Sequence, residues 1–203
     1  MRRRLQDRDL LIASSNAGKL TEFTALLSPF GIRVLSLKDL GLIEPDETEF
    51  SFVGTAKLKA RAASLASGLP ALADDSGLTV AALGGLPGIY TADWAERSAG
   101  RDFDHAMEKT WLMLRAVNAE PPWAAAFHCL LVVAWPDGGE AAFHGHISGQ
   151  IVWPKRGRLG HGYDPIFQPD GCDQTMAELP EAEKNRISHR AMAFREFTTL
   201  CFT

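Results

Sequence analysis

The chain has 203 residues, of which 46% are hydrophobic and 23% charged, and its formal net charge at pH 7 is −4. That length suits one α/β domain with a sizeable core, so we expect residues 1–203 to form a single domain. The acidic balance argues against nucleic-acid binding, which depends on an excess of lysine and arginine. No apolar run reaches the ~18 residues that cross a bilayer, and we therefore expect no membrane association.

The N-terminal stretch and the cysteines favour a cytoplasmic protein. The basic start MRRRLQDRDLL leads into an apolar run only from Leu10 to Ala13. A secretory signal peptide needs roughly 7–15 apolar residues at this point. Cys129, Cys172 and Cys201 lie far apart and form no C-x-x-C pair. This spacing disfavours a disulfide framework and a zinc knuckle.

Hydrophobic spacing in the first half alternates between the periods of strands and helices. The predicted elements are a strand over 9–14, a helix over about 17–28, a strand over 32–37, an acidic loop over 43–51, a helix over 52–67, a strand over 70–77 that runs into a turn, a short strand over 78–83, and an irregular stretch over 84–100. Pro29 and Gly31 end the first helix.

The second half predicts one further helix, a hairpin and a C-terminal helix. Residues 103–117 have the spacing of an amphipathic helix that buries its aromatic side chains. Residues 124–153 predict two long strands joined by a turn at Asp137–Gly139. A Gly-rich loop over 156–167 follows, and the last helix starts near Ser188. This order predicts an α/β fold in which helices flank a mixed sheet.

The motif SSNAGK, Ser14 to Lys19, lies where the first strand gives way to a helix. Such a turn places backbone N–H groups and the positive end of the helix dipole at one spot, which favours an anion. Gly18 lets a ligand approach the backbone, and Lys19 adds a full charge. Alternatively, Asn16 merely caps the helix. The motif is not a Walker loop, because Leu20 follows the lysine.

The motif ADDSG, Ala73 to Gly77, places two adjacent carboxylates at the end of a strand. In an extended chain Asp74 and Asp75 point to opposite sides, so that one can hold Mg²⁺ while the other accepts a hydrogen bond. The alternative is an Asx-type turn, for which Asp-Asp-Ser-Gly has suitable chemistry.

The motif EKNRISHRA, Glu183 to Ala191, combines a helix start with several cations. Ser188 is a good N-cap, which places His189 and Arg190 in the first turn, where an anionic or polar group must face them to offset the helix dipole. For Lys184 and the residues around it, a solvated basic loop is the favoured reading.

Two other features have simpler explanations. His144 and His146 fall on one face of a strand, but a metal site needs further ligands, so we expect two surface histidines. The basic stretch PKRGR is expected to be a solvated loop in this acidic chain.

Taken together and in order, these pieces resemble the inosine/xanthosine triphosphate pyrophosphatase family. The matching stretches are IASSNAGKLTEF, KLKARAAS, ALADDSGLTVAALGGLPGIYTADWA, FHCLLVVAWPDG, GHISGQIVWPKRGRLGHGYDPIF and AELPEAEKNRISHRAMAF. The resemblance implies an elongated α/β fold of two lobes with a central cleft, a Mg²⁺ cofactor, a nucleoside triphosphate substrate and usually a homodimer. It also implies cleavage of deaminated purine nucleoside triphosphates to a monophosphate and pyrophosphate by a single domain.

The resemblance also implies a set of site residues. It places the catalytic carboxylate at Asp75, which also binds the metal, and assigns a second metal ligand to Glu47. The implied substrate-binding residues are Ser14, Ser15, Asn16, Ala17, Gly18, Lys19, Lys59, Asp74, Ser76, His161, Gly162, Tyr163, Asp164, Lys184, His189 and Arg190.

Three positions depart from the family pattern. A Glu-Asn pair is replaced by Gly54-Thr55, so that Glu47 or Glu49 must compensate or activity is weaker. The position before GYDP often holds an aromatic residue in the family. Here it holds His161, which stacks less strongly on a purine. The position that follows Y-S-A in the family often holds a basic residue, whereas this chain has Asp93 there. Two other functions stay open: a nucleotide-binding sensor without turnover, and a pyrophosphatase for modified pyrimidine or 7-methylguanine nucleotides.

Overall fold

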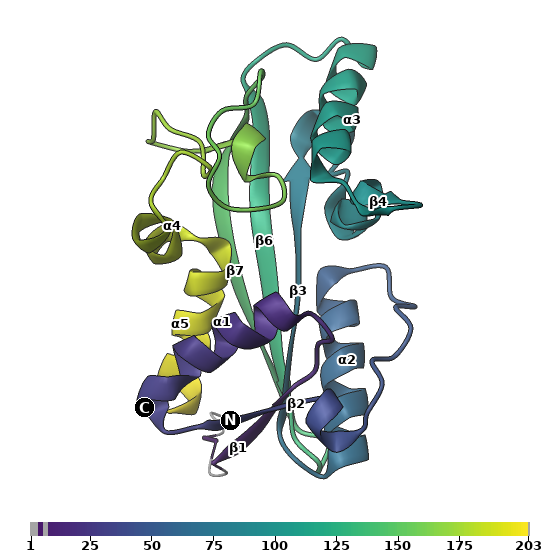
Figure 1. The fold of residues 1–203 in the computed structure, drawn as a ribbon, viewed down its shortest axis with the longest axis vertical. Coiled ribbons are helices and arrows are strands. Elements are labelled where there is room, and N and C mark those ends of the chain that lie inside the picture. The colour runs from purple at the N-terminus through teal and green to yellow at the C-terminus, as the bar shows by residue number, and fades with distance from the viewer. Residues whose placement is uncertain (1–3, 6–7, 203) are drawn as a thin grey trace. The chain divides into compact units, whose positions relative to one another are not determined.

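The computed structural model describes residues 4–5 and 8–202 (Figure 1). The first three residues of the basic start lie outside the described residues. The strands are β1 (Asp9–Ile12), β2 (Arg33–Ser36), β3 (Ala71–Val80), β4 (Glu96–Arg97), β5 (Gly100–Arg101), β6 (Trp123–Ala134), β7 (Glu140–Ile151) and β8 (Phe167–Pro169). The α-helices are α1 (Ala17–Leu27), α2 (Phe52–Ser67), α3 (Phe103–Ala116), α4 (Glu181–Ile187) and α5 (His189–Cys201). The 3₁₀ helices are η1 (Ser28–Phe30), η2 (Lys38–Leu40), η3 (Ala81–Leu83), η4 (Gly88–Thr91), η5 (Asp93–Ala95) and η6 (Asp164–Ile166).

Six of the strands in this described part of the chain form one mixed sheet in the order β2-β1-β3-β6-β7-β8. β1 pairs in parallel with both β2 and β3, whereas β7 and β8 are antiparallel. Leu10, Leu11 and Ile12 have no exposed surface, as a strand buried on both faces of a parallel sheet requires. The predicted α/β fold with a mixed sheet and helices is confirmed.

The predicted elements match the structure closely in several places. The helix predicted over 52–67 is α2, with Ser51 as its N-cap and Gly68 in the left-handed conformation at its C-terminal end. The hairpin of β6 and β7 turns at the predicted point, where the Gly138 N–H donates to the Trp135 carbonyl over 3.0 Å. The last helix is capped by Ser188, whose Oγ accepts from the Ala191 N–H over 3.1 Å.

Two predictions about local structure were wrong. The turn expected within 70–77 and the separate strand after it are one continuous strand, β3. The strand continues through Asp74 and Asp75 between its neighbours β1 and β6, so the turn chemistry of Asp-Asp-Ser-Gly is overridden by sheet pairing. The basic loop expected around Lys184 is helix α4, and Lys184 itself is buried.

The chain divides into two compact units, each with its own core. Unit 1 comprises Met1–Asp75, Leu130–His144 and Ala193–Thr203, and unit 2 comprises Ser76–Cys129 and Gly145–Met192. Strands β3, β6 and β7 and helix α5 contribute residues to both units. The core of unit 1 packs alanines of α2 against β1, β3 and β6. The core of unit 2 gathers larger side chains, among them Met107, Phe127 and Tyr163.

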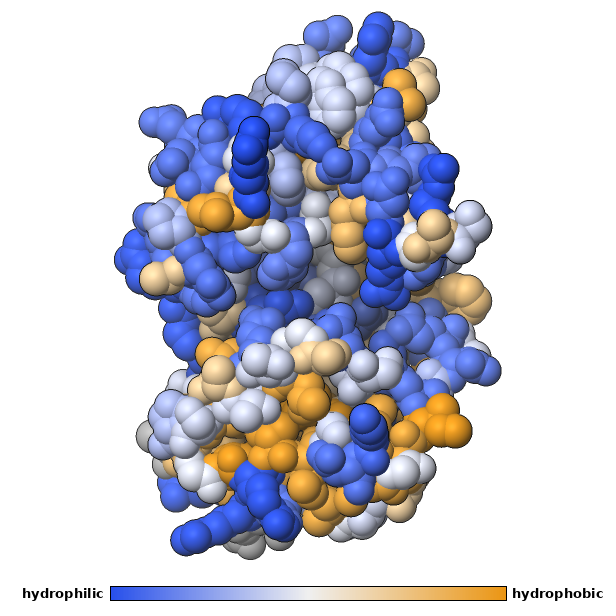
Figure 2. Space-filling model, viewed as in Figure 1, coloured by the Kyte–Doolittle hydropathy of each residue, from blue (hydrophilic) through white to orange (hydrophobic). Residues whose placement is uncertain are grey.

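Apolar residues also reach the surface of unit 1. Figure 2 shows them gathered over the part of this unit that α1, α2 and β2 form. Ile43 and Phe50, on the loop between η2 and α2, are 92% and 85% exposed. No helix in the described stretches of the chain is both long and apolar enough to span a membrane.

Candidate active site

The first group of site residues lies at the carboxyl end of β1 and on the middle residues of the adjacent strand β3. In the sheet order β2-β1-β3, the connection through α1 leads from β1 to β2, whereas the connection through α2 leads from β2 to β3 on the other side of β1. Ligands of α/β sheets bind where connections lead in opposite directions in this way. Ile12 is opposite Leu72 in the parallel register. Ser14 and Asp74 each follow that pair by two residues, so the register brings the predicted SSNAGK and ADDSG motifs together.

The SSNAGK turn is held by its own side chains. Asn16 Oδ1 accepts from the Gly18 N–H at 2.9 Å and from the Lys19 N–H at 3.2 Å, and Ser14 Oγ accepts from the Asn16 N–H. Asn16 therefore caps α1, as the simpler alternative predicted. A Cβ on Gly18 would lie 3.2 Å from Asn16 Oδ1, so the glycine also leaves room for this cap.

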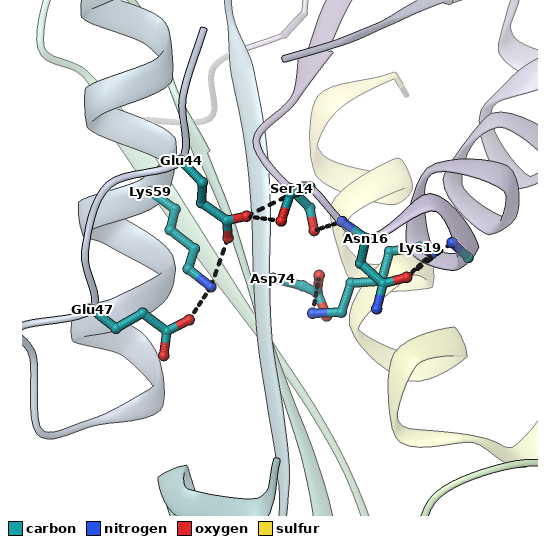
Figure 3. A network of polar contacts seen from close by, with 9 residues as sticks. Ser14, Asn16, Lys19, Glu44, Glu47, Lys59 and Asp74 are labelled. Carbon is teal, nitrogen blue, oxygen red and sulfur yellow. Dashed lines mark hydrogen bonds and ion pairs between the residues drawn. The ribbon is translucent and has the colours of Figure 1, made fainter. Parts of the chain in front are cut away.

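Lys19 forms an ion pair with a deeply buried carboxylate (Figure 3). Its Nζ lies 2.9 Å from Asp74 Oδ1, and the Asp74 side chain has no exposed surface. A buried carboxylate needs such a partner, because an unpaired charge in the interior is costly. The predicted proximity of Lys19 and Asp74 is thus a direct contact that links α1 to β3.

Lys59 lies between two glutamates of the loop that precedes α2. Its Nζ contacts Glu44 Oε1 at 3.0 Å and also pairs with Glu47 Oε1. Burial opposes the charge on Lys59, but Glu47 and Glu44 outweigh it and raise the pKa of the lysine. The other oxygen of Glu44 accepts from the Ser15 N–H at 2.8 Å and from the Ser15 Oγ at 2.6 Å. Burial opposes the charge on Glu44 too, yet Ser15 and Lys59 lower its pKa below the usual value.

The carboxyl group of Asp75 is strongly perturbed by its surroundings. Burial raises the pKa of Asp75 to about 6, and the charges of Glu47 and Asp74 add to that rise, whereas Lys19 and Lys59 oppose it. A carboxylate of this pKa is a better proton acceptor at neutral pH than an ordinary aspartate. Perturbed carboxyl groups beside charged partners are typical of catalytic sites.

The group formed by these side chains carries more negative than positive charge. Glu44, Glu47, Asp74 and Asp75 lie around Lys19 and Lys59. Four carboxylates and two ammonium groups give a net charge of −2 at pH 7. A triphosphate needs additional positive charge to bind beside them. The residues present fit Mg²⁺, because this ion prefers carboxylate oxygens and binds through one or two of them together with substrate phosphates.

The Gly54 departure has a local explanation. Gly54 lies in the first turn of α2, where its N–H donates to the Ser51 Oγ over 3.1 Å. A Cβ at this position would lie 2.7 Å from Glu49 Oε2 and 2.9 Å from Ser51 Oγ. The Glu49 carboxylate thus already lies beside the position where the family pattern has a glutamate.

The second group of site residues lies in unit 2 and centres on Asp164. Its Oδ2 accepts from the His161 N–H at 3.1 Å and lies 3.2 Å from Lys184 Nζ. Gly160 has a φ of +79°, and a Cβ there would lie 2.1 Å from Asp164 Oδ2. Both the backbone angle and the close approach require glycine at this position. Asp164 therefore holds the loop over 156–163 against α4 through the buried Lys184.

A cavity of about 680 Å³ opens beside this loop. That volume lies within the range of small-molecule sites. His161 and Gly162 line it together with Arg158, Phe103 and Met107. The cavity combines an exposed imidazole and a cation with apolar walls, which suits a flat aromatic ligand with polar edges.

The remaining predicted residues of unit 2 have other surroundings. Tyr163 is 1% exposed and donates from its hydroxyl to the Thr91 carbonyl over 3.1 Å, so its side chain belongs to the core. Burial raises the pKa of Tyr163 well above its usual value. The His189 ring stacks on Phe127, with ring centroids 5.1 Å apart. His189 and Arg190 begin α5 and are not among the residues that line the cavity.

Sequence reasoning missed Glu44 and Gly160. Glu44 was read only as part of an acidic loop, and nothing in its spacing distinguished it from its acidic neighbours. Gly160 could have been singled out, because a glycine four residues before a buried aspartate is compatible with a close backbone approach.

Comparison with known proteins supports the same assignment. The model of the Ham1 family matches residues 10–200. The dITP/XTP pyrophosphatase of Ruegeria pomeroyi is 54% identical over 193 residues, with 95% of each chain covered. That of Rhizobium meliloti is 50% identical over 210 residues, with 98% of each chain covered.

Solved structures show the same fold. A HAM1 protein from Coxiella burnetii matches with a TM-score of 0.88 at 36% identity, over 94% of this chain and 96% of that chain. A nucleoside-triphosphatase / dITP/XTP pyrophosphatase from Mycobacterium abscessus matches with a TM-score of 0.79 at 36% identity, over 96% and 100% of the two chains. With a family model along nearly its whole length and relatives at half identity, this chain belongs to the Ham1 family.

Proposed function

We propose that this chain hydrolyses deaminated purine nucleoside triphosphates (ITP, dITP and XTP) to the monophosphate and pyrophosphate, and so removes them from the cytoplasmic nucleotide pool. The observation that carries the proposal is the ion pair of Lys19, in the SSNAGK turn that follows β1, with Asp74 of the Asp74-Asp75 pair in the middle of β3. The names of the relatives from Ruegeria pomeroyi and Rhizobium meliloti support the substrate class.

The residues of unit 1 act on the phosphates. Lys19 and Lys59 bind phosphate oxygens with Ser14, Ser15 and the turn from Asn16 to Gly18, while Asp74 keeps the Lys19 ammonium in place. Asp75 accepts a proton from the attacking water. When bound by Asp75 and Glu47, Mg²⁺ offsets negative charge on the triphosphate and polarises a phosphoryl oxygen. Ser76, the next residue of β3 and the first of unit 2, binds the same phosphates.

The residues of unit 2 bind the base. His161 stacks on the purine and Gly162 gives it room, while Asp164 and Lys184 fix the loop that carries them. Tyr163 supports this loop from the core. The start of α5 at His189 and Arg190 supplies donors to a keto oxygen.

We further propose that the two units act as one nucleoside triphosphate pyrophosphatase domain over residues 1–203, because the family match covers both of them. The resemblance also favours a homodimer, which light scattering of the purified protein would test.

Product analysis tests the proposed function. A panel of nucleoside triphosphates with Mg²⁺ is incubated with the enzyme, and pyrophosphate and orthophosphate are scored separately. We expect pyrophosphate and a nucleoside monophosphate from dITP and XTP. A diphosphate with orthophosphate as the first products would refute the assignment, and binding without any product would favour a nucleotide sensor.

A further inference from the structure

The Glu44 carboxylate accepts hydrogen bonds from groups that could otherwise donate to a phosphate. Its two carboxylate oxygens receive the Ser15 N–H, the Ser15 hydroxyl and the Lys59 ammonium, over 2.8, 2.6 and 3.0 Å (Figure 3). A backbone N–H, a hydroxyl and an ammonium group are also the donors that proteins direct at phosphate oxygens. A carboxylate, whose negative charge is shared by two oxygens, can therefore accept from the same set of donors.

Glu44 differs from the other acceptors around the SSNAGK turn. Ser14 and Asn16, which receive the other N–H groups, belong to the turn itself and are fixed with it. Glu44 comes from a loop 29 residues further along the chain. It can leave the turn without unfolding α1.

The loop that carries Glu44 has little regular structure. Residues 41–51, between η2 and α2, contain no helix or strand, and Ile43 and Phe50 are almost fully exposed. Segments with few buried contacts open at low free-energy cost. The contacts of Glu44 with Ser15 and Lys59 can therefore break by a local movement.

We propose that the Glu44 carboxylate occupies a phosphate subsite in the ligand-free enzyme, so that the substrate's phosphates must displace it to bind. The proposal rests on the proposed function, because it takes Ser15 and Lys59 as phosphate-binding groups. Glu44 is then an internal competitor, and it weakens binding in proportion to the small fraction of molecules in which it has left.

Two other roles for Glu44 predict different behaviour. If Glu44 only positions Ser15 and Lys59, its loss weakens phosphate binding. If it acts only through its negative charge at a distance, Glu44→Asp changes nothing, because aspartate keeps that charge. Glu44→Asp also lacks one methylene group, so it cannot reach Ser15 and Lys59 together from the same backbone position.

The test is calorimetric titration of inorganic pyrophosphate into metal-free protein in EDTA. The proteins are the wild type, Glu44→Asp, Glu44→Gln and, as a control, Asp46→Asn, which removes an exposed carboxylate from the same loop. Circular dichroism confirms that each variant is folded. We expect both Glu44 variants to bind pyrophosphate about tenfold more tightly or better, and Asp46→Asn to stay within about twofold of the wild type.

Unchanged or weaker binding by Glu44→Asp would overturn the proposal, as would a Glu44→Gln affinity no greater than that of Asp46→Asn. Binding that is undetectable in every protein would also overturn it. The product assay with dITP separates this failure from that of the proposed function. Release of pyrophosphate by the wild type, together with unchanged binding in Glu44→Asp, leaves the function intact and removes only the competitor.

Discussion

At the scale of single residues, the proposed mechanism depends most on Asp75. Asp75→Asn keeps the shape of the side chain but removes the charge to which we assign proton transfer and metal binding. We expect kcat to fall roughly 10²-fold or more, the usual scale for a general base. Steady-state pyrophosphate release with dITP and saturating Mg²⁺ measures this, with folding checked by circular dichroism. A variant that keeps most of its turnover would move the role to Asp74.

Lys19 has a different proposed role: it pairs with Asp74 in the structure, and we propose that it binds phosphate throughout the reaction. Lys19→Ala should therefore mainly raise KM and leave kcat less affected. Lys38→Ala, which removes an exposed lysine from η2, is the matched control. If KM and kcat both stay at wild-type values, Lys19 serves only to neutralise Asp74.

At the scale of elements, α2 is tied to the start of β7 by charges. Glu140 lies 2.6 Å from Lys57 Nζ and 2.6 Å from Arg61 Nε, and these two partners lower its pKa. A carboxyl group whose pKa is lowered in the folded state stabilises that state above its unfolded pKa, and the stabilisation is lost as pH falls through the folded value.

Glu140→Gln should thus lower the free energy of unfolding by about 0.5–1 kcal/mol at pH 7, the scale of accessible ion pairs. This difference from the wild type should shrink as pH falls below 4.5, the ordinary value for glutamate. Urea unfolding at pH 7 and at pH 3 measures it, with the exposed Glu120→Gln as control. A difference that is equally large at both pH values would exclude the charge as its cause.

The elements also show how far local sequence determines structure. Helix α2 was predictable to the residue because Ser51 and Gly68 mark its ends. Strand β3 was not, because Asp74 and Asp75 favour a turn locally, and only pairing with neighbouring strands keeps them extended. Helix α4 was missed for a similar reason. The buried Lys184 pairs with Asp164, which lies 20 residues earlier in the chain. The hydrophobic periodicity of the local sequence cannot reveal such a distant partner.

The candidate site was predictable in its members more than in its contacts. The motifs marked Lys19 and the Asp74-Asp75 pair, because each lies in a distinctive local pattern, whereas Lys59 was assigned only through the family resemblance. Lys19 meets Asp74 because of the parallel register of β1 and β3, and Lys59 meets Glu44 because of the path of the loop before α2. These contacts between distant segments bring four carboxylates around two lysines.

At the scale of the whole molecule, the function depends on discrimination between purines. A 6-keto oxygen is a hydrogen-bond acceptor, whereas the 6-amino group of adenine is a donor. In the proposed site, donors at the start of α5, including Arg190, match the keto form, and each mismatched partner costs about 1–3 kcal/mol. We expect kcat/KM for ITP to exceed that for ATP by on the order of 10²–10⁴.

The same comparison in Arg190→Ala assigns the source of this preference, which should shrink if the guanidinium contributes. Equal kcat/KM values for ITP and ATP in the wild type would refute the proposed substrate class even if pyrophosphate is released. A large preference that survives in Arg190→Ala would leave backbone groups as its origin.

The division into two units has a consequence for optical measurements on this protein. Of the five tryptophans, Trp94, Trp111, Trp123 and Trp153 belong to unit 2, and only Trp135 belongs to unit 1. Three of them form one cluster, in which the Trp111 ring stacks on Trp153 with centroids 5.5 Å apart and meets Trp123 edge-on. Unit 1 packs phenylalanines instead, such as Phe143 against Phe197. Intrinsic fluorescence therefore reports mainly on unit 2, whereas far-ultraviolet circular dichroism reports on both units. Unfolding curves from the two signals coincide only if the units lose structure together.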